Sequence, residues 1–361
     1  MNLEQQIGSA KLLELLSANK KELDSIALNF LPKTSQDKQI STLYDMMRDY
    51  PSRGGKGFRG SLCLLWCELW GGKRENALLT AAALELYQNW ILIHDDIEDA
   101  SDLRRGLPAL HKKYGIPLSI NAGDALHGKM WELLLSNQEK LGEEITLQIL
   151  REFSTMLNET TEGQQMELSW NALQDWEITE PEYFLMVTKK SAWYTCISPA
   201  RIGTILASAS PIQESHERTK ILEQIVEMGT NMGIAFQIVD DVLNLTASQD
   251  KYGKEILGDI LEGKRTLMLI HLLSSCEDFE GKKIASIMSK PRTEKDPSEV
   301  EEVFNLMKKT GSVQYASELA HRHAQRGLAI YESLCHSYGL ESSKTFETTR
   351  LLLEYLVKRD Y

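Results

Sequence analysis

Cysteine is scarce in this sequence, and the few cysteines form no pattern. The 361 residues contain five of them, an odd number, scattered along the chain. A disulfide framework needs more cysteines at closer spacing, so we expect reduced thiols and a cytoplasmic protein. The five are Cys63, Cys67, Cys196, Cys276 and Cys335.

Long apolar runs and an excess of positive charge are also missing. No window approaches the roughly 18 uninterrupted apolar residues of a membrane span, and the N-terminal segment lacks the basic-then-apolar order of a signal peptide. The sequence has 52 acidic and 40 basic residues, a formal charge of −12. This charge gives no general attraction to nucleic acid or anionic membranes. We therefore expect no nucleic-acid partner and no integral membrane segment.

Alternating apolar and polar runs joined by Asn-Gly or Asp-Gly turns are nearly absent, which argues against a sheet of any size. Apolar residues recur instead at helical spacing, as in Ile221, Ile225, Met228 and Met232. With 42% hydrophobic and 25% charged residues, the composition is that of a globular protein with a substantial core. The pattern predicts an all-α fold.

Local signals place some helix ends. Thr179 and Asp296 each precede a proline by one or two positions and a glutamate by three, which predicts a capped helix start at each. Gly311 follows two lysines and predicts a helix end. Three stretches, 51–60, 248–263 and 289–297, are predicted to be irregular, but none is a long linker. We therefore expect one helical domain over residues 1–361.

Acidic residues cluster after the apolar segment Trp90-Ile91-Leu92-Ile93. On a helix, Asp95 and Asp99 share one face because they are four residues apart, whereas Asp96 points about 100° away. Two like charges side by side destabilise a bare helix by a few tenths of a kcal/mol. A cation would relieve this repulsion, and an all-oxygen ligand set indicates Mg²⁺ or Mn²⁺.

A second acidic cluster, Asp240-Asp241-Val242-Leu243-Asn244, also follows an apolar helical segment, and Asp240 and Asn244 share a face. Either cluster alone is equally well explained as a solvated helix end, but two of them favour metal binding. Basic residues accompany glycines in segments 54–60, 103–106 and 263–265, as suits diphosphate oxygens. For each basic set alone, surface solubility is the alternative.

Together these elements resemble the trans-isoprenyl diphosphate synthases, the head-to-tail prenyltransferases. Segments 95–99 and 236–241 are similar to the family's two aspartate-rich motifs, and 104–111 resembles the R-R-G-x-P-x-x-H segment after the first. Segment 163–167 resembles the G-Q-x-x-D element, and 190–192 stands where the family has Lys-Thr-Ala or Lys-Thr-Gly. The match runs from about Lys56 to about Lys264. It implies the family's all-α bundle with a central active-site cavity.

The resemblance also implies a set of metal ligands. Asp95 and Asp99 would bind two Mg²⁺ ions that bridge an allylic diphosphate, and Asp240 would bind a third, with Mn²⁺ as the alternative metal. Asp96 and Asp241 would support these sites. Asn244 stands where the family has an aspartate, which removes a charge but keeps an oxygen, so we expect weaker metal binding without loss of activity.

Substrate contacts follow from the same resemblance. Residues expected to hold the allylic diphosphate are Arg104, Lys190, Lys254 and Lys264. Residues expected to hold isopentenyl diphosphate are Lys56, Arg59, Gln88 and Arg105. The Ser191 hydroxyl, the Gln237 side-chain carbonyl and the main-chain carbonyl of Lys190 would face the allylic carbocation that forms as diphosphate leaves. The sequence departs from the family pattern at two of these elements: Ser191 stands where the family has threonine, and Glu167 stands where it has aspartate. We expect both changes to be tolerated.

Trp90, five residues before Asp95, would form the floor of the tunnel that receives the growing chain. An aromatic side chain there resembles short-chain synthases that make fifteen- to twenty-carbon products, with ordinary core packing of Trp90 as the alternative. The Tyr-x-Asn and D-D-I-E-D segments around it most resemble geranylgeranyl diphosphate synthases, and farnesyl or longer products stay open. Two rival functions stay open. One is a noncatalytic partner subunit, because Cys63 and Cys67 resemble the C-x-x-x-C element of such subunits. The other is a terpene cyclase, which would leave the isopentenyl diphosphate residues without a purpose. The family also implies a homodimer.

Overall fold

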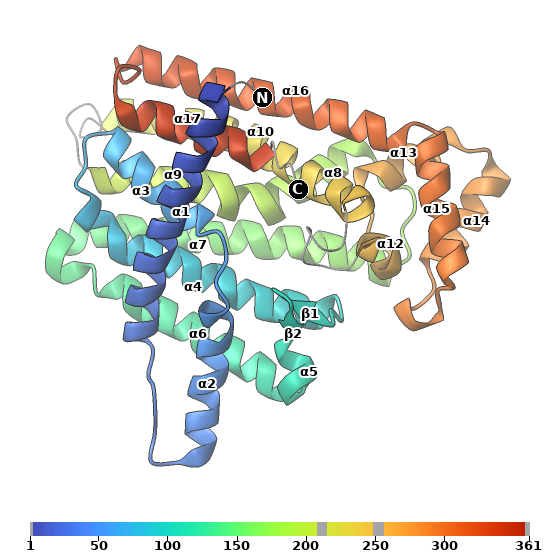
Figure 1. The fold of residues 1–361 in the computed structure, drawn as a ribbon, viewed down its shortest axis with the longest axis horizontal. Helices are drawn as coiled ribbons and strands as arrows, with labels where there is room; N and C mark the ends of the chain where they lie inside the picture. The colour runs from blue at the N-terminus through green and yellow to red at the C-terminus, as the bar shows by residue number, and fades with distance from the viewer. Residues whose placement is uncertain (1–2, 208–214, 248–255, 358–361) are drawn as a thin grey trace. The chain divides into compact units, whose positions relative to one another are not determined.

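The computed structural model describes residues 3–207, 215–247 and 256–357 and confirms the all-α prediction (Figure 1). The elements up to residue 172 are α1 (Leu3–Phe30), α2 (Lys38–Ser52), α3 (Phe58–Leu69), α4 (Arg74–Glu98), β1 (Leu103–Arg104), β2 (Leu107–Pro108), α5 (Leu110–Tyr114), α6 (Ile116–Leu135) and α7 (Gln138–Ala172). The later elements are α8 (Glu180–Val187), η1 (Thr188–Ile197), α9 (Ser198–Ala207), α10 (Ser215–Thr246), α12 (Gly258–Glu262), α13 (Leu267–Ser275), α14 (Asp278–Met288), η2 (Arg292–Glu294), α15 (Pro297–Lys309), α16 (Ser312–Ser337) and α17 (Lys344–Val357).

The chain forms two compact units and enters each of them three times. The first unit comprises Met1–Thr155, Ser198–Ile225 and Ser333–Leu352, and the second comprises Met156–Ile197, Val226–Glu332 and Leu353–Tyr361. Neither unit is one continuous segment. A single domain over residues 1–361 stays a prediction.

The first unit is built around α3, whose residues are buried on nearly every side. Helix α3 packs against α4 and α9, and α4 also packs against α6. A Cβ on Gly203 of α9 would lie 2.5 Å from the carbonyl oxygen of Cys63, so the glycine permits this close helix contact. Cys63 and Cys67 are fully buried in α3 and serve there as core residues.

The second unit has its own core, built from α8, α10, α13, α14, α15 and part of α16. Ile234, Ile238 and Leu245 on one side of α10 contribute to it, as do Tyr183 and Met186 of α8. Helices α12, α14 and α15 contact one another (Figure 1). This group carries the segment around Lys264.

The predicted helix signals are confirmed where they rest on side-chain caps. Thr179 accepts a hydrogen bond from the amide of Glu182 at the start of α8, and Asp296 caps α15 in the same way. Helix α15 ends at Lys309, two residues before Gly311, whose φ is +73°. None of the described helices is both long and apolar enough to cross a membrane.

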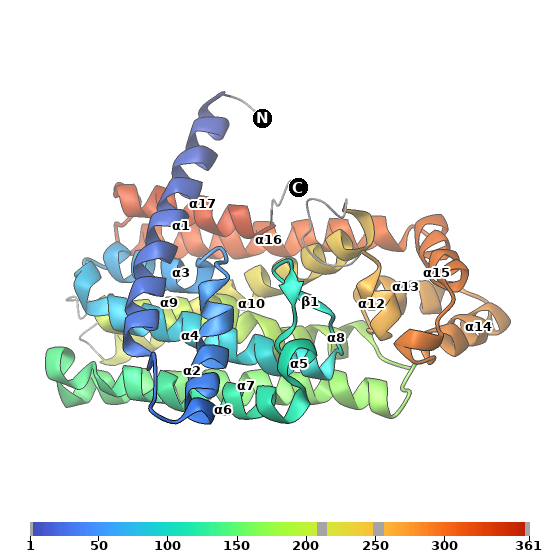
Figure 2. The ribbon, with the colours of Figure 1, turned by 60° about the horizontal axis from the view of Figure 1, so that its bottom comes forward.

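Three details differ from expectation. Pro51 lies inside α2, one residue before its end, rather than in a loop. Helix α12 and the short 3₁₀ turn η2 form within two of the segments predicted to be irregular. In the described part of the chain, the only sheet is a hairpin with two residues per strand, which follows α4 and precedes α5 (Figure 2).

Candidate active site

The acidic cluster of the first unit lies at the C-terminal end of α4. Asp99 is the C-cap residue, and its amide donates to the carbonyl oxygen of Asp95 at 2.9 Å. The two aspartates therefore stand one helical turn apart, as the spacing predicted. The last turn of α4 contains no basic residue, although the negative end of the helix dipole disfavours anions there. Compensating positive charge has to come from elsewhere.

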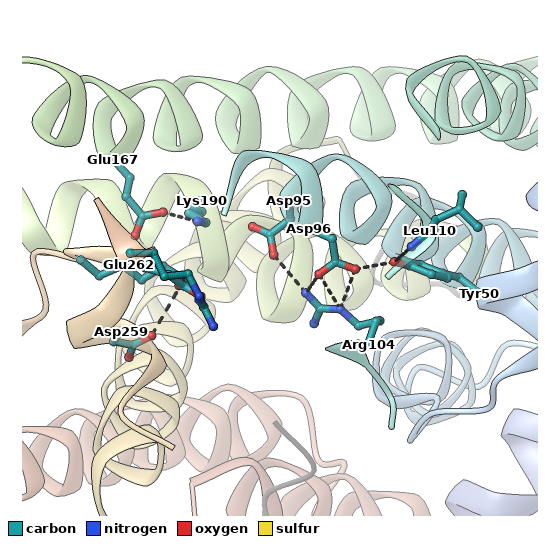
Figure 3. Close-up of polar contacts among 11 residues, drawn as sticks. Tyr50, Asp95, Asp96, Arg104, Leu110, Glu167, Lys190, Asp259 and Glu262 are labelled. Carbon is teal, nitrogen blue, oxygen red and sulfur yellow. Dashed lines mark hydrogen bonds and ion pairs between the residues drawn. The ribbon is translucent and has the colours of Figure 1, made fainter. Parts of the chain in front are cut away.

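Part of that charge comes from Arg104 of β1. Its Nε lies 2.9 Å from Asp96, which also pairs with Nη2, and Nη2 lies 3.5 Å from Asp95 (Figure 3). Asp96 is fully buried and accepts a further hydrogen bond from the Tyr50 hydroxyl. Burial alone would lower the pKa of Arg104, but the hydrogen bond and charge of Asp96 raise it above its usual value. The carboxylate of Asp96 is thus engaged by protein groups.

Asp95 and Asp99 fit a hard divalent cation by the chemistry of their donors. Both are half-buried carboxylates on one helix face. Among the described residues, no group of three or more His, Cys, Asp or Glu side chains could hold a metal ion by itself. Mg²⁺ is commonly bound through one or two carboxylates, with substrate phosphates and water as the remaining ligands. The donors at this helix end suit that mode of binding.

The hairpin of β1 and β2 carries the second predicted arginine. Arg105 stands at the turn with a φ of +52°, followed by Gly106 at +74°. Its Nη1 donates to the main-chain oxygen of Tyr50 at 2.7 Å and to Oδ1 of Asn89 at 3.1 Å. Burial lowers the pKa of Arg105. Arg104 and Arg105 are neighbours in sequence but contact different groups.

The glycine-rich segment of residues 54–60 lies beside Arg105. A Cβ on Gly55 would be 3.4 Å from Cζ of Arg105 and 3.4 Å from Cε of Lys20. Lys56 is exposed in this loop, and Arg59 lies in the first turn of α3. Sequence reasoning missed Lys20, which comes from α1, because no local signal connects it to this loop. The structure thus brings Lys20, Arg105 and the glycine loop together.

Gln88, one of the residues predicted to hold isopentenyl diphosphate, lies in α4. Its Oε1 atom is buried and has no hydrogen-bond partner among the described residues. A buried amide oxygen without a partner is costly, so a ligand or water that donates to it would be stabilised. This observation suits a substrate-binding role for Gln88.

Trp90 packs in a group of aromatic side chains within the first unit. Its ring stacks on His127 of α6 with centroids 4.0 Å apart, and it meets Tyr87 edge to face at 5.3 Å. The indole N–H of Trp131 donates to Nε2 of His127 at 2.9 Å and fixes the orientation of that imidazole. Burial lowers the pKa of His127, which favours the neutral ring. Trp90 is therefore held rigidly between α4 and α6.

In the second unit, Lys190 and Ser191 lie in the π-helix η1. Glycines of two neighbouring helices meet this segment. A Cβ on Gly163 of α7 would overlap the main chain of Lys190, and one on Gly233 of α10 would overlap Ala192. π-helices are rare and often mark functional sites. The sequence indicated which residues of this segment matter, but it did not predict their π-helical backbone.

Lys190 pairs with Glu167 of α7 (Figure 3). Glu167, one of the departures from the family pattern, thereby orients a lysine expected to contact diphosphate. Its longer side chain keeps the carboxylate that an aspartate would supply.

Ser191, Gln237 and Asp241 form a hydrogen-bonded chain. The Ser191 hydroxyl donates to Oε1 of Gln237 at 2.7 Å, and the Gln237 amide donates to Oδ1 of Asp241 at 2.8 Å. The Tyr183 hydroxyl donates to the other Asp241 oxygen at 2.9 Å. Burial raises the pKa of Asp241 to about 7, although both hydrogen bonds favour the ionised form. Tyr183 was missed from the sequence because it lies 58 residues before Asp241.

Asn244 connects the second acidic cluster to α12. Its Oδ1 accepts a hydrogen bond from the amide of Asp259 at 3.0 Å, and its main-chain oxygen accepts from the amide of Leu257 at 2.9 Å. Lys264, just after α12, lies 2.9 Å from Glu262 and 3.9 Å from Asp259. The side-chain oxygen expected to bind metal therefore caps the helix that leads to Lys264.

Arg265 belongs to the basic set of residues 263–265 that was predicted to meet phosphate, but its side chain contacts protein groups instead. It is buried and donates to the main-chain oxygens of Asp175 and Trp170, each at 3.1 Å. Its guanidinium lies 3.8 Å from the centroid of the Trp176 ring. Arg265 therefore fixes the segment around Lys264 instead of facing solvent. Lys254, the remaining predicted site residue, lies outside the described residues.

Comparison with known proteins gives a consistent match. The family model described as Polyprenyl synthetase matches residues 40–307. The chain is 32% identical to a geranylgeranyl diphosphate synthase of Sulfolobus acidocaldarius over 92% of this chain and 96% of that protein. It is also 32% identical to a geranylfarnesyl diphosphate synthase of Natronomonas pharaonis, over 77% of this chain and 80% of that protein.

The fold has a solved counterpart. The crystal structure of a geranylgeranyl pyrophosphate synthetase from Pyrococcus horikoshii matches with a TM-score of 0.80 and 30% identity, over 96% of this chain and 99% of that one. The likeness thus extends over nearly the full length of both chains.

Proposed function

The chain belongs to the polyprenyl synthetase family of prenyltransferases, and on that basis we propose that it joins an allylic diphosphate to isopentenyl diphosphate and releases inorganic diphosphate. The observation that carries this proposal is the ion-paired arrangement of Arg104 with Asp95 and Asp96 at the acidic end of α4. It places a guanidinium suited to diphosphate beside carboxylates suited to a divalent metal.

We propose that Asp95, Asp99 and Asp240 bind the divalent ions that the family uses, with three Mg²⁺ ions per site and Mn²⁺ as a substitute. When bound, these ions supply positive charge that offsets the charge developing on the leaving diphosphate. Asp96 and Asp241 orient neighbouring groups through their hydrogen bonds to Tyr50 and Tyr183. For Asn244, we favour capping of α12 over direct metal binding, because its Oδ1 already accepts the Asp259 amide.

The protein groups divide between the two substrates. In this proposal, Arg104, Lys190, Lys254 and Lys264 hold the allylic diphosphate. Lys56, Arg59, Gln88 and Arg105 hold isopentenyl diphosphate, and the unpartnered Oε1 of Gln88 together with the burial of Arg105 supports this assignment. Two separate sites keep the two diphosphates apart and position the reacting carbons.

The reaction begins when the carbon–oxygen bond of the allylic diphosphate breaks and leaves an allylic carbocation. The double bond of isopentenyl diphosphate attacks this cation and forms the new carbon–carbon bond. A proton then leaves to the released diphosphate. Ser191, Gln237 and the main-chain carbonyl of Lys190 stabilise the cation through their dipoles, since none of them is an anionic nucleophile that would trap it. Exclusion of water protects it from hydrolysis.

For the product we propose geranylgeranyl diphosphate, with farnesyl or longer diphosphates as the second candidate. The support is Trp90, whose large ring is braced by His127 and therefore suits a fixed tunnel floor. The Sulfolobus acidocaldarius relative is named for the twenty-carbon product and the Natronomonas pharaonis relative for a longer one.

We also propose a homodimer and a cytoplasmic location. Ile116 and Ile120, one turn apart on α6, are 50% and 40% exposed, and apolar residues grouped on a surface commonly mark an interface. The small number of cysteines in the sequence supports the location. Sedimentation of the purified protein measures the assembly directly.

The function is tested by incubating purified protein with Mg²⁺, isopentenyl diphosphate and one allylic diphosphate at a time, with mass spectrometry of the dephosphorylated products. A ladder that ends at one length is expected. Absence of elongation with every allylic substrate, in protein shown to be folded, would overturn the proposal. A cyclic hydrocarbon from one substrate would favour the cyclase, and activity only after addition of a synthase would favour the partner subunit.

A further inference from the structure

The hairpin that carries Arg104 and Arg105 is too small to be stable alone. Each strand has two residues, and Leu103 and Leu107 are about half exposed. Isolated hairpins with more pairing than this are marginal in water. Arg105 also adopts a positive φ of +52° without being glycine, a conformation that is unfavourable for a residue with a Cβ. Contacts outside the hairpin must therefore hold it in place.

Arg53, at the C-terminal end of α2, makes such contacts. Its Nη1 donates to the main-chain oxygen of Arg104 at 3.0 Å, and its Nη2 donates to the main-chain oxygen of Pro108 at 2.9 Å. One guanidinium thus binds both strands of the hairpin. The Arg53 side chain is 5% exposed, and its hydrogen bond to the Arg104 oxygen is partly buried, whereas the one to the Pro108 oxygen lies at the surface.

Two further contacts fix the guanidinium itself. Nε of Arg53 lies 2.5 Å from Oδ1 of Asp49, and Cζ lies 4.6 Å from the centroid of the Tyr50 ring. The other oxygen of Asp49 accepts from Lys113 of α5 at 3.1 Å. Only arginine offers a planar set of donors that satisfies a carboxylate and two separate carbonyls together. A lysine would reach one of these groups at a time.

We propose that Arg53 is a positioning residue that sets the placement of the hairpin, and through it the placement of both Arg104 and Arg105. This inference rests on the proposed function, which gives the two arginines to two different substrates. Because the side chain of Arg104 meets Asp96 while that of Arg105 meets Tyr50 and Asn89, a shift of their common backbone misplaces both. Arg53 itself contacts neither substrate in this scheme.

The inference predicts that loss of Arg53 raises the KM values of both substrates, whereas loss of a residue that binds one substrate directly raises only one. Arg104→Ala should raise KM for the allylic diphosphate alone, and Arg105→Ala should raise KM for isopentenyl diphosphate alone. Arg53→Ala should raise both KM values by about tenfold, the effect of losing one or two charge-assisted hydrogen bonds. Arg53→Lys should recover only part of this loss. Added ethylguanidinium should lower both KM values of Arg53→Ala.

The structural readout is hydrogen–deuterium exchange of residues 103–110 in the substrate-free protein, which does not depend on activity. Exchange there should be faster in Arg53→Ala than in wild type. The matched control is Arg326→Ala, which removes an arginine that is 66% exposed and pairs with Glu227 on the surface. It should alter neither the exchange of the hairpin nor either KM.

The outcomes separate the inference from the function on which it rests. Unchanged hairpin exchange in Arg53→Ala, or faster exchange with both KM values unchanged, overturns the role of Arg53 while the elongation activity of wild type stands. A rise in only one KM also overturns it. If wild type makes no product, the proposed function fails, and the exchange experiment still reports whether Arg53 holds the hairpin.

Discussion

The hydroxyl of Tyr50 lies 2.5 Å from a carboxylate oxygen of Asp96 and also accepts the amide of Leu110 at 3.0 Å. One phenol therefore ties the acidic end of α4 to the first residue of α5. Burial, followed by the charge and hydrogen bond of Asp96, raises the pKa of Tyr50 above its ordinary value, so it remains a donor at all physiological pH values. Asp96 is fully buried, and a buried carboxylate depends on such donors for its stability.

Tyr50→Phe should lower the free energy of unfolding by about 1–3 kcal/mol, because it leaves a buried oxygen of Asp96 without this donor. Urea denaturation measures the change. Tyr315→Phe is the control, since the Tyr315 hydroxyl donates to Glu180 at a partly exposed site, where the carboxylate regains water. Equal losses in the two variants would contradict the role assigned to Tyr50.

Gly163→Ala should destabilise the protein by about 1–3 kcal/mol and reduce activity, because the new methyl group would displace the main chain of Lys190. The control is Gly128→Ala in α6, where nothing lies within 4 Å of the added Cβ. That substitution should stabilise the helix by about 0.5–1 kcal/mol. Thermal unfolding of both variants checks the opposite signs, and a shift in the same direction would be evidence against the close approach at Lys190.

Trp90→Ala should lengthen the product, because it removes the ring stacked on His127 and opens the proposed tunnel floor. Mass spectrometry of the dephosphorylated products gives the chain length directly. Phe279→Ala is a suitable control, as Phe279 is 83% exposed on α14 and should leave the length unchanged. An unchanged product from Trp90→Ala would mean that this ring is ordinary core.

Asn244→Ala should speed hydrogen exchange over residues 257–263, because α12 loses the acceptor for the Asp259 amide. Loss of such a cap costs about 1 kcal/mol. Asn244→Ser keeps a hydroxyl acceptor and should restore much of the protection. A variant that weakens Mg²⁺ binding in calorimetry while leaving exchange unchanged would instead favour metal binding by Asn244.

Lys295 should make stability rise with pH above neutrality. It is buried and donates to the main-chain oxygen of Leu261 at 2.8 Å. Burial, together with the charges of Arg265 and Arg292, lowers the pKa of Lys295 to about 8. An unfolded lysine titrates near 10.4, so between about pH 8 and 10.4 the unfolded chain binds more protons and the free energy of unfolding increases with pH. Below pH 8 both states are protonated, and no such slope is expected.

The measurement compares wild type with Lys295→Met by urea denaturation at pH 7.5 and pH 9.5. The rise in unfolding free energy between the two pH values should be larger for wild type. Other groups that titrate in this range contribute equally to both proteins and cancel in the comparison. Parallel behaviour of the two proteins would exclude a depressed pKa at Lys295.

The sequence was sufficient wherever a signal is local. Capping at Thr179 and Asp296 is encoded within four residues, and the spacing of Asp95 and Asp99 follows from helical geometry. The family resemblance also rested on short motifs, and the comparisons confirm it.

Contacts between distant segments escaped prediction. Lys20 meets the glycine loop from α1, and Arg265 turns inward because main-chain oxygens near Trp170 receive its donors. The β1–β2 hairpin was missed because its turn is Arg-Gly, which lacks the usual Asn-Gly or Asp-Gly signature. In each case, the deciding partner is far away in the sequence or the local pattern is atypical.

The π-helix η1 sets a limit on how this protein can change in length. A π-helix holds its residues in a wider register than an α-helix. Deletion of one residue within 188–197 would favour the α-helical register and turn the residues on one side by about 100° relative to the other. Lys190 could not then keep Glu167 while Ala192 stays against Gly233. A gained or lost residue in this segment would therefore break one of these two contacts.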